Sequence, residues 1–439
     1  MFFVAASLLL AMVSTGKADD GFSILEGHGG PVMGLATDRD GEDRLSASFD
    51  YSVGLWRAKA SQPVWLEGHQ AAANSVAFID AGKAVSGGDD YALIIWDLNA
   101  GKALQRLEGH EGKVLSVKVS PDKNWIASAG WDRRAGLWEA NSGRLVHWLT
   151  GHRSSVNDVE FSADSKTLYT ASHDGTVRSW HLDTGMQQRV EVKHGFGVNR
   201  LLLDDKKGWL AYGALDGGTR VIDLDTGKEI ADITLDRRPI LSLALNQDSS
   251  RLAVGDGDGY IMVLDTIDWS VARDFKAVKA GPVWALSYTA DGRLLSGGLD
   301  NAILVWPSDE RVEAQGPDEQ PFHRPPAEME NGERQFVRKC SICHSLGIEV
   351  GREAGPPLGG VFGRVVGTVK GYKYSPALIG KSLVWNEDTI DALFRIGPDE
   401  LTPGSKMPIQ RITGAQDRSD LVQYLKRATN VADELDKKE

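Results

Sequence analysis

The segment Cys340-Ser-Ile-Cys343-His344 places two thiols and an imidazole within five residues. Each thiol of such a pair can add to a vinyl group of a haem and the adjacent histidine can bind the iron, so Cys-x-x-Cys-His is the attachment motif of c-type haem. Zinc is one alternative, but it usually takes four protein ligands, and no Cys or His follows His344. A redox-active dithiol is the other alternative, and it would not need the histidine.

A second iron ligand can be predicted by elimination. All ten histidines lie at or before position 344, and Met407 is the one methionine that follows the motif. His323 could reach the iron only by folding its own segment over the haem, at a cost in chain entropy. Lys406 is the remaining competitor, because a neutral amine can also bind iron. The thioether of Met407 favours ferrous iron and raises the reduction potential.

Residues 331–430 resemble the class I, mitochondrial-type cytochromes c. The matching segments are Gly355-Pro356-Pro-Leu358, Gly363-Arg364, Gly371-Tyr372-Lys-Tyr374-Ser-Pro-Ala377, Trp385, Pro403-Gly404-Ser-Lys-Met407 and Arg418-Ser-Asp-Leu421-Val-Gln-Tyr424-Leu425. The resemblance implies an all-α domain that carries one covalent haem c. It also implies crossing first and last helices, and we expect Gly332 and Phe336 at that crossing.

The same resemblance assigns roles around the haem. Cys340 and Cys343 would attach it, and His344 and Met407 would bind the iron. The carbonyl of Pro356 would orient His344. Haem propionates would be bound by Arg364, Tyr372, Tyr374 and Trp385. This chain has Leu378 and Leu393 where the family commonly has asparagine and tyrosine near the methionine, so we expect a drier pocket.

The first three quarters of the chain repeat with a period of about 42 residues. The repeat is marked by seven aspartates: Asp50, Asp90, Asp132, Asp174, Asp216, Asp258 and Asp300. A hydroxyl stands four residues earlier in five repeats (Ser46, Ser86, Ser128, Thr170, Ser296), and a tryptophan six residues later in the same five (Trp56, Trp96, Trp138, Trp180, Trp306). Gly-His pairs with His28, His69, His110 and His152 precede the first four aspartates.

This pattern over residues 22–306 resembles the WD-repeat family and implies an all-β, seven-bladed propeller. In that family the four polar side chains form a buried hydrogen-bonded relay, so these histidines and aspartates are interpreted as structural. Blades five and six have Tyr212 and Val254 at the hydroxyl position and lack the tryptophan, so we expect apolar packing there. No strand pattern follows Trp306, and we expect residues 22–25 to complete the last blade and close the ring.

The remaining segments indicate targeting and connection. Residues 1–18 have the apolar run and small-residue end of a cleavable export signal. Residues 307–330 contain five prolines and many acids, which predicts a semi-extended linker, and residues 431–439 form a charged tail. The chain has 49 basic and 61 acidic residues, of which 16 basic and 14 acidic residues follow residue 330. The net charge is therefore −14 for the first 330 residues and +2 for the rest. Nucleic acid is therefore an unexpected partner, and no apolar stretch is long enough for a membrane span.

These features together predict a periplasmic one-electron carrier rather than an enzyme, with a propeller that docks a redox partner protein. Phe49 and Trp131, with Tyr51 and Tyr91 nearby, could form the docking surface, or they could pack under neighbouring loops. Two other functions stay open. One is a redox-sensing scaffold or assembly factor for a periplasmic respiratory enzyme. The other is an oxidoreductase with a cofactor in the propeller, which predicts a second chromophore.

Overall fold

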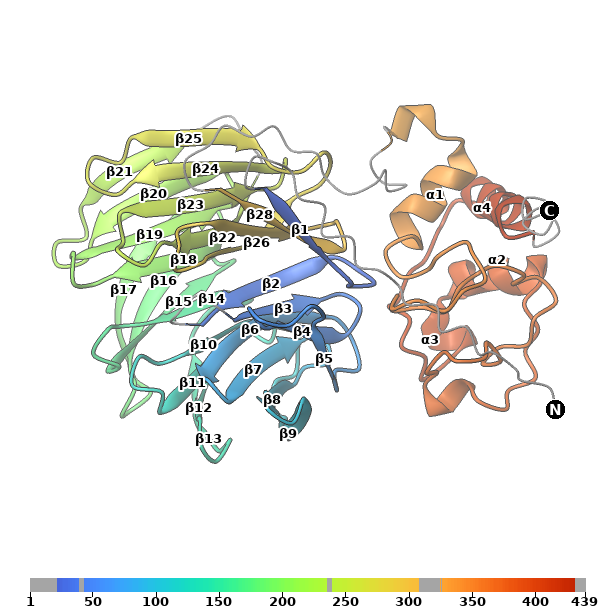
Figure 1. The fold of residues 1–439 in the computed structure, drawn as a ribbon, viewed down its shortest axis with the longest axis horizontal. Helices are drawn as coiled ribbons and strands as arrows, with labels where there is room; N and C mark the ends of the chain where they lie inside the picture. The colour runs from blue at the N-terminus through green and yellow to red at the C-terminus, as the bar shows by residue number, and fades with distance from the viewer. Residues whose placement is uncertain (1–21, 39–42, 235–238, 308–323, 325, 431–439) are drawn as a thin grey trace, which may run out of the picture.

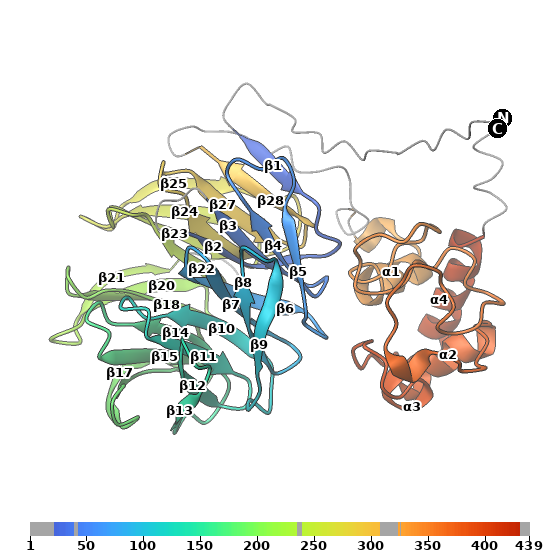
Figure 2. The same cartoon turned by 60° about the horizontal axis from the view of Figure 1, so that its bottom comes forward.

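The computed structural model describes residues 22–38, 43–234, 239–307, 324 and 326–430. The described residues between 22 and 307 form a ring of seven four-stranded antiparallel sheets, and residues 326–430 form a helical domain beside it (Figures 1 and 2). The predicted seven-bladed propeller is confirmed. No helix among the described residues is long and apolar enough to cross a membrane. The predicted export signal, the linker up to residue 323 and the tail at 431–439 lie outside the described residues.

Each blade is a meander of short strands. Blades one to three are β2 (Val32–Thr37), β3 (Arg44–Ser48), β4 (Ser52–Trp56) and β5 (Val64–Glu67); β6 (Ala73–Asp80), β7 (Lys83–Gly88), β8 (Leu93–Asp97) and β9 (Lys102–Leu107); and β10 (Val114–Val119), β11 (Trp125–Gly130), β12 (Arg134–Glu139) and β13 (Leu145–Thr150). Blade four is β14 (Val156–Phe161), β15 (Thr167–Ser172), β16 (Thr176–His181) and β17 (Gln187–Lys193).

Blades five to seven continue the pattern. They are β18 (Val198–Asp204), β19 (Trp209–Ala214), β20 (Gly218–Asp223) and β21 (Glu229–Thr234); β22 (Ile240–Leu245), β23 (Arg251–Asp256), β24 (Tyr260–Asp265) and β25 (Val271–Lys276); and β26 (Val283–Tyr288), β27 (Leu294–Gly298), β28 (Ala302–Trp306) and β1 (Ser23–Glu26). Strand β1 pairs antiparallel with β28, with Ser23 opposite Val305. The predicted closure of the ring by the first strand is confirmed, and it removes an exposed sheet edge.

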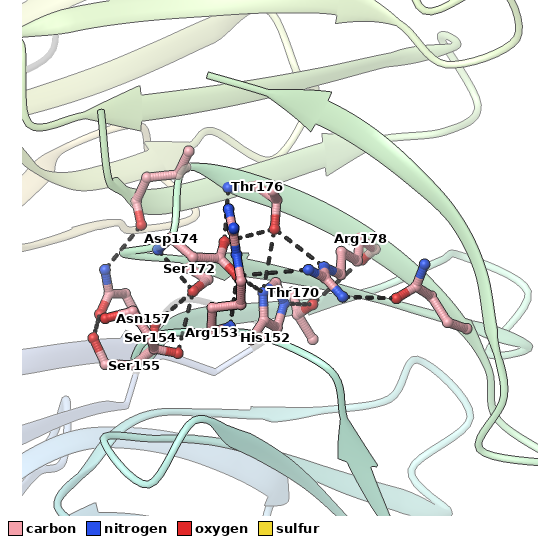
Figure 3. A network of polar contacts seen from close by, with 12 residues as sticks. His152, Arg153, Ser154, Ser155, Asn157, Thr170, Ser172, Asp174, Thr176 and Arg178 are labelled. Carbon is pink, nitrogen blue, oxygen red and sulfur yellow. Dashed lines mark hydrogen bonds and ion pairs between the residues drawn. The ribbon is translucent and has the colours of Figure 1, made fainter. Parts of the chain in front are cut away.

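The predicted polar relay is present in the first four blades, and Figure 3 shows its His152, Thr170 and Asp174 side chains in blade four. There, Nδ1 of His152 lies 3.0 Å from the Asp174 carboxylate and Nε2 lies 2.7 Å from Oγ1 of Thr170. The indole N–H of Trp180 donates to the same hydroxyl at 2.9 Å. The other three relays repeat these contacts at 2.7–3.0 Å. The histidine, hydroxyl, aspartate and indole groups of these four relays thus find their partners inside their own blade.

Apolar packing was expected in blades five and six, and in blade five Tyr212 and Ile222 do lie in a buried apolar cluster, but part of the polar relay remains there as well. His194 occupies the histidine position there, and its Nε2 lies 3.1 Å from the carboxylate of Asp216. Arg220 adds an ion pair of 2.9 Å to the same carboxylate. Blade six follows the expectation more closely, since Val254 is buried with Leu252, Met262, Leu264 and other apolar side chains.

The helical domain is built from short elements around one apolar core. They are η2 (Pro326–Glu328), α1 (Asn331–Lys339), η3 (Pro376–Leu378), α2 (Glu387–Ile396), α3 (Pro398–Leu401) and α4 (Ala415–Ala428). A Cβ on Gly332 would lie 2.1 Å from the carbonyl oxygen of Asp420, so α1 and α4 approach too closely for any other residue. The rings of Phe336 and Tyr424 meet at 5.6 Å beside this point. The expected crossing at Gly332 and Phe336 is confirmed.

The end of the predicted linker belongs to the helical domain. Residues 326–328 form a 3-10 turn, and the Met329 side chain is 6% exposed. Glu330 pairs with Arg427 of α4 at 2.6 Å. The prediction of a semi-extended tether up to residue 330 is therefore wrong for these residues, because they form a turn, bury Met329 and pair with α4.

Candidate functional site

The thiol pair follows directly after α1. The backbone N–H of Cys340 still donates to the carbonyl of Phe336 at 2.8 Å, and the N–H groups of Cys343 and His344 both donate to the carbonyl of Cys340 at 2.9 Å. The motif is thus a tight turn that extends the helix. Both cysteines are free and buried. Burial raises the pKa of each thiol to about 12, so both are neutral.

His344 is oriented by the loop behind it. Its Nδ1 lies 2.7 Å from the carbonyl oxygen of Pro356. A carbonyl can only accept, so Nδ1 carries the proton and Nε2 carries the lone pair. Burial lowers the pKa of His344, which keeps the imidazole neutral. A Cβ on Gly355 would lie 2.3 Å from Cε1 of the ring, so only glycine fits between the loop and the imidazole. The structure agrees with the role that the resemblance gives to Pro356.

These groups open into one cleft of about 1130 Å³, its open mouth included. Met407 lies on the same cleft as Cys340, Cys343 and His344, although more than sixty residues separate it from the motif. The lining is mainly apolar, with Leu358, Val361, Leu378, Ile390, Leu393 and Phe394. Leu378 and Leu393 therefore face the site where a drier pocket was expected.

The four predicted propionate-binding residues also line this cleft. The guanidinium of Arg364 donates to the carbonyls of Gly359 at 3.1 Å and of Pro357 at 2.9 Å, so it holds the loop behind His344. The hydroxyl of Tyr372 donates to the carbonyl of Ala354. The rings of Tyr372 and Tyr374 meet edge to face at 4.8 Å. Trp385 exchanges backbone hydrogen bonds with Gly363 and Arg364. Propionate binding by these residues stays a prediction.

The residues of the cleft fit a covalently held haem. Two neutral thiols stand at one wall, and a histidine with its lone pair on Nε2 stands beside them. Met407 supplies a thioether on the same cleft, and the apolar lining suits a porphyrin face.

Sequence reasoning missed the contribution of the propeller to this cleft. Tyr51, in the turn between β3 and β4, is the one described lining residue from outside the helical domain. Burial raises its pKa above the ordinary range. Arg352 and Lys373 on the helical domain also meet the propeller. The turn position of Tyr51 gave little signal, because it is occupied by glycine in blades four to six but by Tyr91 and Arg133 in blades two and three.

The predicted docking residues divide between two environments. Trp131 is 55% exposed, and the Lys113 ammonium lies 5.1 Å from its ring centre. Tyr91 is also exposed, and Phe49 is half-buried. Tyr51 is half-buried at the cleft of the helical domain, so it does not belong to an open surface. Partner docking at Trp131 stays a prediction.

Comparison with known proteins agrees with the blade structure. The family described as WD domain, G-beta repeat matches residues 22–57, 61–97, 101–139, 143–181 and 272–307. The unmatched stretch holds blades five and six, where the relay is altered. A crystal structure of the WD40 β-propeller domain of Doa1 is similar with a TM-score of 0.59 and 23% identity. The match covers 66% of this chain and 98% of that one.

The helical domain has curated relatives. Cytochromes c of Sesamum indicum and Gossypium barbadense are each 39% identical over 105 residues, which is 24% of this chain and 94% of each relative. Cytochrome c of Chlamydomonas reinhardtii is 38% identical over 105 residues, 93% of its length. The matched length is that of a whole cytochrome c domain. Over this quarter of its length, which follows a seven-bladed WD-repeat propeller, the chain belongs to the cytochrome c family.

Proposed function

We propose that this protein is an exported, periplasmic c-type cytochrome that carries single electrons. One observation supports this most strongly: two buried neutral thiols, the Nε2 of an oriented His344 and the thioether of Met407 lie on one apolar cleft. A class I cytochrome c domain with one haem c accounts for that combination. A zinc site or a bare dithiol would leave Met407 and the apolar lining without a role.

Each residue then has a distinct task. Cys340 and Cys343 would hold the haem covalently, and the hydrogen-bonded turn that follows α1 fixes their spacing. Pro356 keeps the proton of His344 on Nδ1, so that Nε2 is available to bind iron. Met407 would be the second protein ligand to the iron, and Leu378 and Leu393 on the same cleft would keep water away from it. A haem held in this way supplies one-electron exchange between ferric and ferrous iron. Ligation of the iron by both His344 and Met407 would favour electron transfer over substrate chemistry.

The propeller is proposed to dock a protein partner. The relay side chains satisfy one another within the blades, so they contribute stability rather than chemistry. Trp131 with Lys113 over its ring is an exposed aromatic anchor of the kind found at interfaces. Partners are expected to be redox proteins rather than nucleic acids, given the −14 charge of the first 330 residues.

The proposal is tested by producing the protein with a signal and a c-type haem maturation system. We expect a mass increase of one haem that survives denaturing electrophoresis. A partner is then captured from periplasm and identified by mass spectrometry, and steady-state electron transfer to the cytochrome is measured. Haem that is lost on denaturation would refute the cytochrome assignment. Tight binding without electron flow would favour the redox-sensing scaffold instead.

A further inference from the structure

Among the described residues of the propeller, one side chain lines the cleft, that of Tyr51. Tyr51 has a positive φ of 73°, in a turn where blades four to six carry glycine. Its hydroxyl donates to the carbonyl of Lys406 at 3.4 Å, and the Lys406 ammonium lies 5.7 Å from its ring centre. Lys406 directly precedes Met407. Blades two and three also hold non-glycine residues at this position, Tyr91 and Arg133, so the contacts with Lys406 rather than the positive φ distinguish Tyr51.

Charged contacts surround that tyrosine. Glu67 at the end of β5 pairs with Lys373 at 2.6 Å and lies 3.9 Å from Arg352. The Arg352 guanidinium stacks 4.1 Å from the ring centre of Trp65 and lies 4.0 Å from the Asp50 carboxylate. The acidic partners belong to the propeller and the basic partners to the helical domain. This matches the net charges of −14 and +2 on the two parts of the sequence.

The two surfaces also fit closely. A Cβ on Gly29 would lie 2.1 Å from the carbonyl carbon of Arg352. The contact therefore brings backbone against backbone. Most of its ion pairs are partly exposed, with Lys373 83% and Glu67 53% exposed. Such pairs are individually weak and are screened by salt. The two surfaces of the interface are thus complementary in shape, but the ion pairs that hold them together are weak and sensitive to salt.

From this geometry we propose that blade one of the propeller is the docking partner of the chain's own haem cleft, and that it caps the cleft against protein-sized electron donors and acceptors. The inference rests on the proposed haem. Tyr51 closes the mouth beside the Met407 loop, and the Glu67, Asp50 and Trp65 contacts hold the cap in place. A protein partner gains access when these contacts break.

The first test measures hydrogen exchange in the haem-loaded protein. Tyr51→Gly removes the ring and suits the positive φ, and Glu67→Lys reverses the charge. We expect exchange at residues 350–356 and 403–408 to become about three- to tenfold faster in both variants, because one or two weak contacts are lost. Matched controls stand at the same positions of blade two: Tyr91→Gly, with φ 65°, and Glu108→Lys. Both should leave these peptides unchanged.

A charge swap and a salt series sharpen the test. Glu67→Lys combined with Lys373→Glu should restore protection, and wild-type protein in 1 M NaCl should resemble Glu67→Lys, since the screening length is then about 3 Å. Unchanged exchange in Tyr51→Gly and Glu67→Lys would overturn the docking. Hydrogen exchange does not depend on electron transfer. A failure of haem attachment would be seen separately, because the protein would lack the added mass of the haem and its absorption spectrum.

The second test measures the cap itself. Oxidation of the reduced protein is followed with ferricyanide, a small acceptor, and with a plant cytochrome c, a protein-sized acceptor. We expect Tyr51→Gly to accelerate the reaction with the protein acceptor about three- to tenfold, and the reaction with ferricyanide much less. Glu67→Lys is compared with Glu108→Lys, which changes the net charge equally. Faster hydrogen exchange without faster electron transfer to the protein acceptor would overturn the capping role.

Discussion

Blade four and the cleft of the helical domain each bury a histidine, and they use it in different ways. His152 engages both ring nitrogens, with Asp174 at 3.0 Å and Thr170 at 2.7 Å. His344 engages Nδ1 with the Pro356 carbonyl and places its ring on a cleft. Burial lowers the pKa of both imidazoles. The pKa therefore does not separate a structural histidine from a ligand, whereas the partners of its two nitrogens do.

The largest effect is expected from breaking the relay. Thr170→Val keeps the side-chain shape but leaves the ring of His152 and the indole N–H of Trp180 without their shared hydroxyl. We expect the propeller's free energy of unfolding to fall by about 2–4 kcal/mol, with the haem spectrum unchanged. Denaturant unfolding measures this. The reverse change in blade six, Val254→Thr, adds a hydroxyl among apolar side chains and should cost about 1–3 kcal/mol. An unchanged free energy of unfolding in Thr170→Val would contradict the structural role of the relay.

A smaller effect is expected at the cleft. Gly355→Ala would bring a Cβ within 2.3 Å of the His344 ring. Displacing the ring or its loop should destabilise the helical domain by about 1–3 kcal/mol and alter the haem absorption spectrum. Gly347→Ala is the control, because nothing lies within 4 Å of the added Cβ. Equal behaviour of the two variants would mean that the loop does not fix the imidazole.

Acid should destabilise the propeller through the relay aspartates. Burial alone would raise their pKa, but hydrogen bonds from His69 and His110 hold the pKa of Asp90 and Asp132 at about 2. The pKa values of these carboxylates lie below the ordinary value of 3.8. Their contribution to the free energy of unfolding is therefore complete above pH 4 and is lost as the pH falls toward 2. We expect a loss on the order of 1 kcal/mol per aspartate. Thermal unfolding from pH 5 to pH 2 measures it, and Asp132→Asn should flatten the profile.

The smallest effect on stability is expected at the exposed surface. Trp131→Ala removes a side chain that is 55% exposed and contacts Lys113. The free energy of unfolding should change by less than about 0.5 kcal/mol, while affinity for a captured periplasmic partner should fall. Titration of that partner against wild type and variant measures the second effect. Unchanged affinity with an intact fold would remove Trp131 from the docking surface.

Periodicity explains what the sequence could predict. The 42-residue spacing of aspartates and tryptophans was enough to predict the blades, the relay and the strand that closes the ring. His194 was missed because Lys193 precedes it, so blade five lacks the Gly-His pair that marked the others. The cleft residues were found because the haem motif and the later segments resemble a known family.

The contact between the two domains could not be predicted in this way. Tyr51, Glu67 and Arg352 meet through the relative placement of two independently folded units, which leaves no periodic signal in either sequence. Blades four to six carry glycine at the equivalent turn, but blades two and three carry Tyr91 and Arg133 there, so the turn residue alone did not distinguish Tyr51. The roles of Arg364, Tyr372, Tyr374 and Trp385 toward propionates still rest on resemblance.

The central claim is that Met407 and His344 bind the iron of a covalently attached haem. The most direct measurement is the near-infrared spectrum of the purified ferric protein at neutral pH, where a methionine–iron bond gives a weak charge-transfer band. We predict the band in wild-type protein and in Met329→Leu, the control on the other methionine of the helical domain. Met407→Leu should lose the band and bind small ligands at the iron. A wild-type ferric protein without the band would contradict the assignment and weaken the electron-carrier proposal.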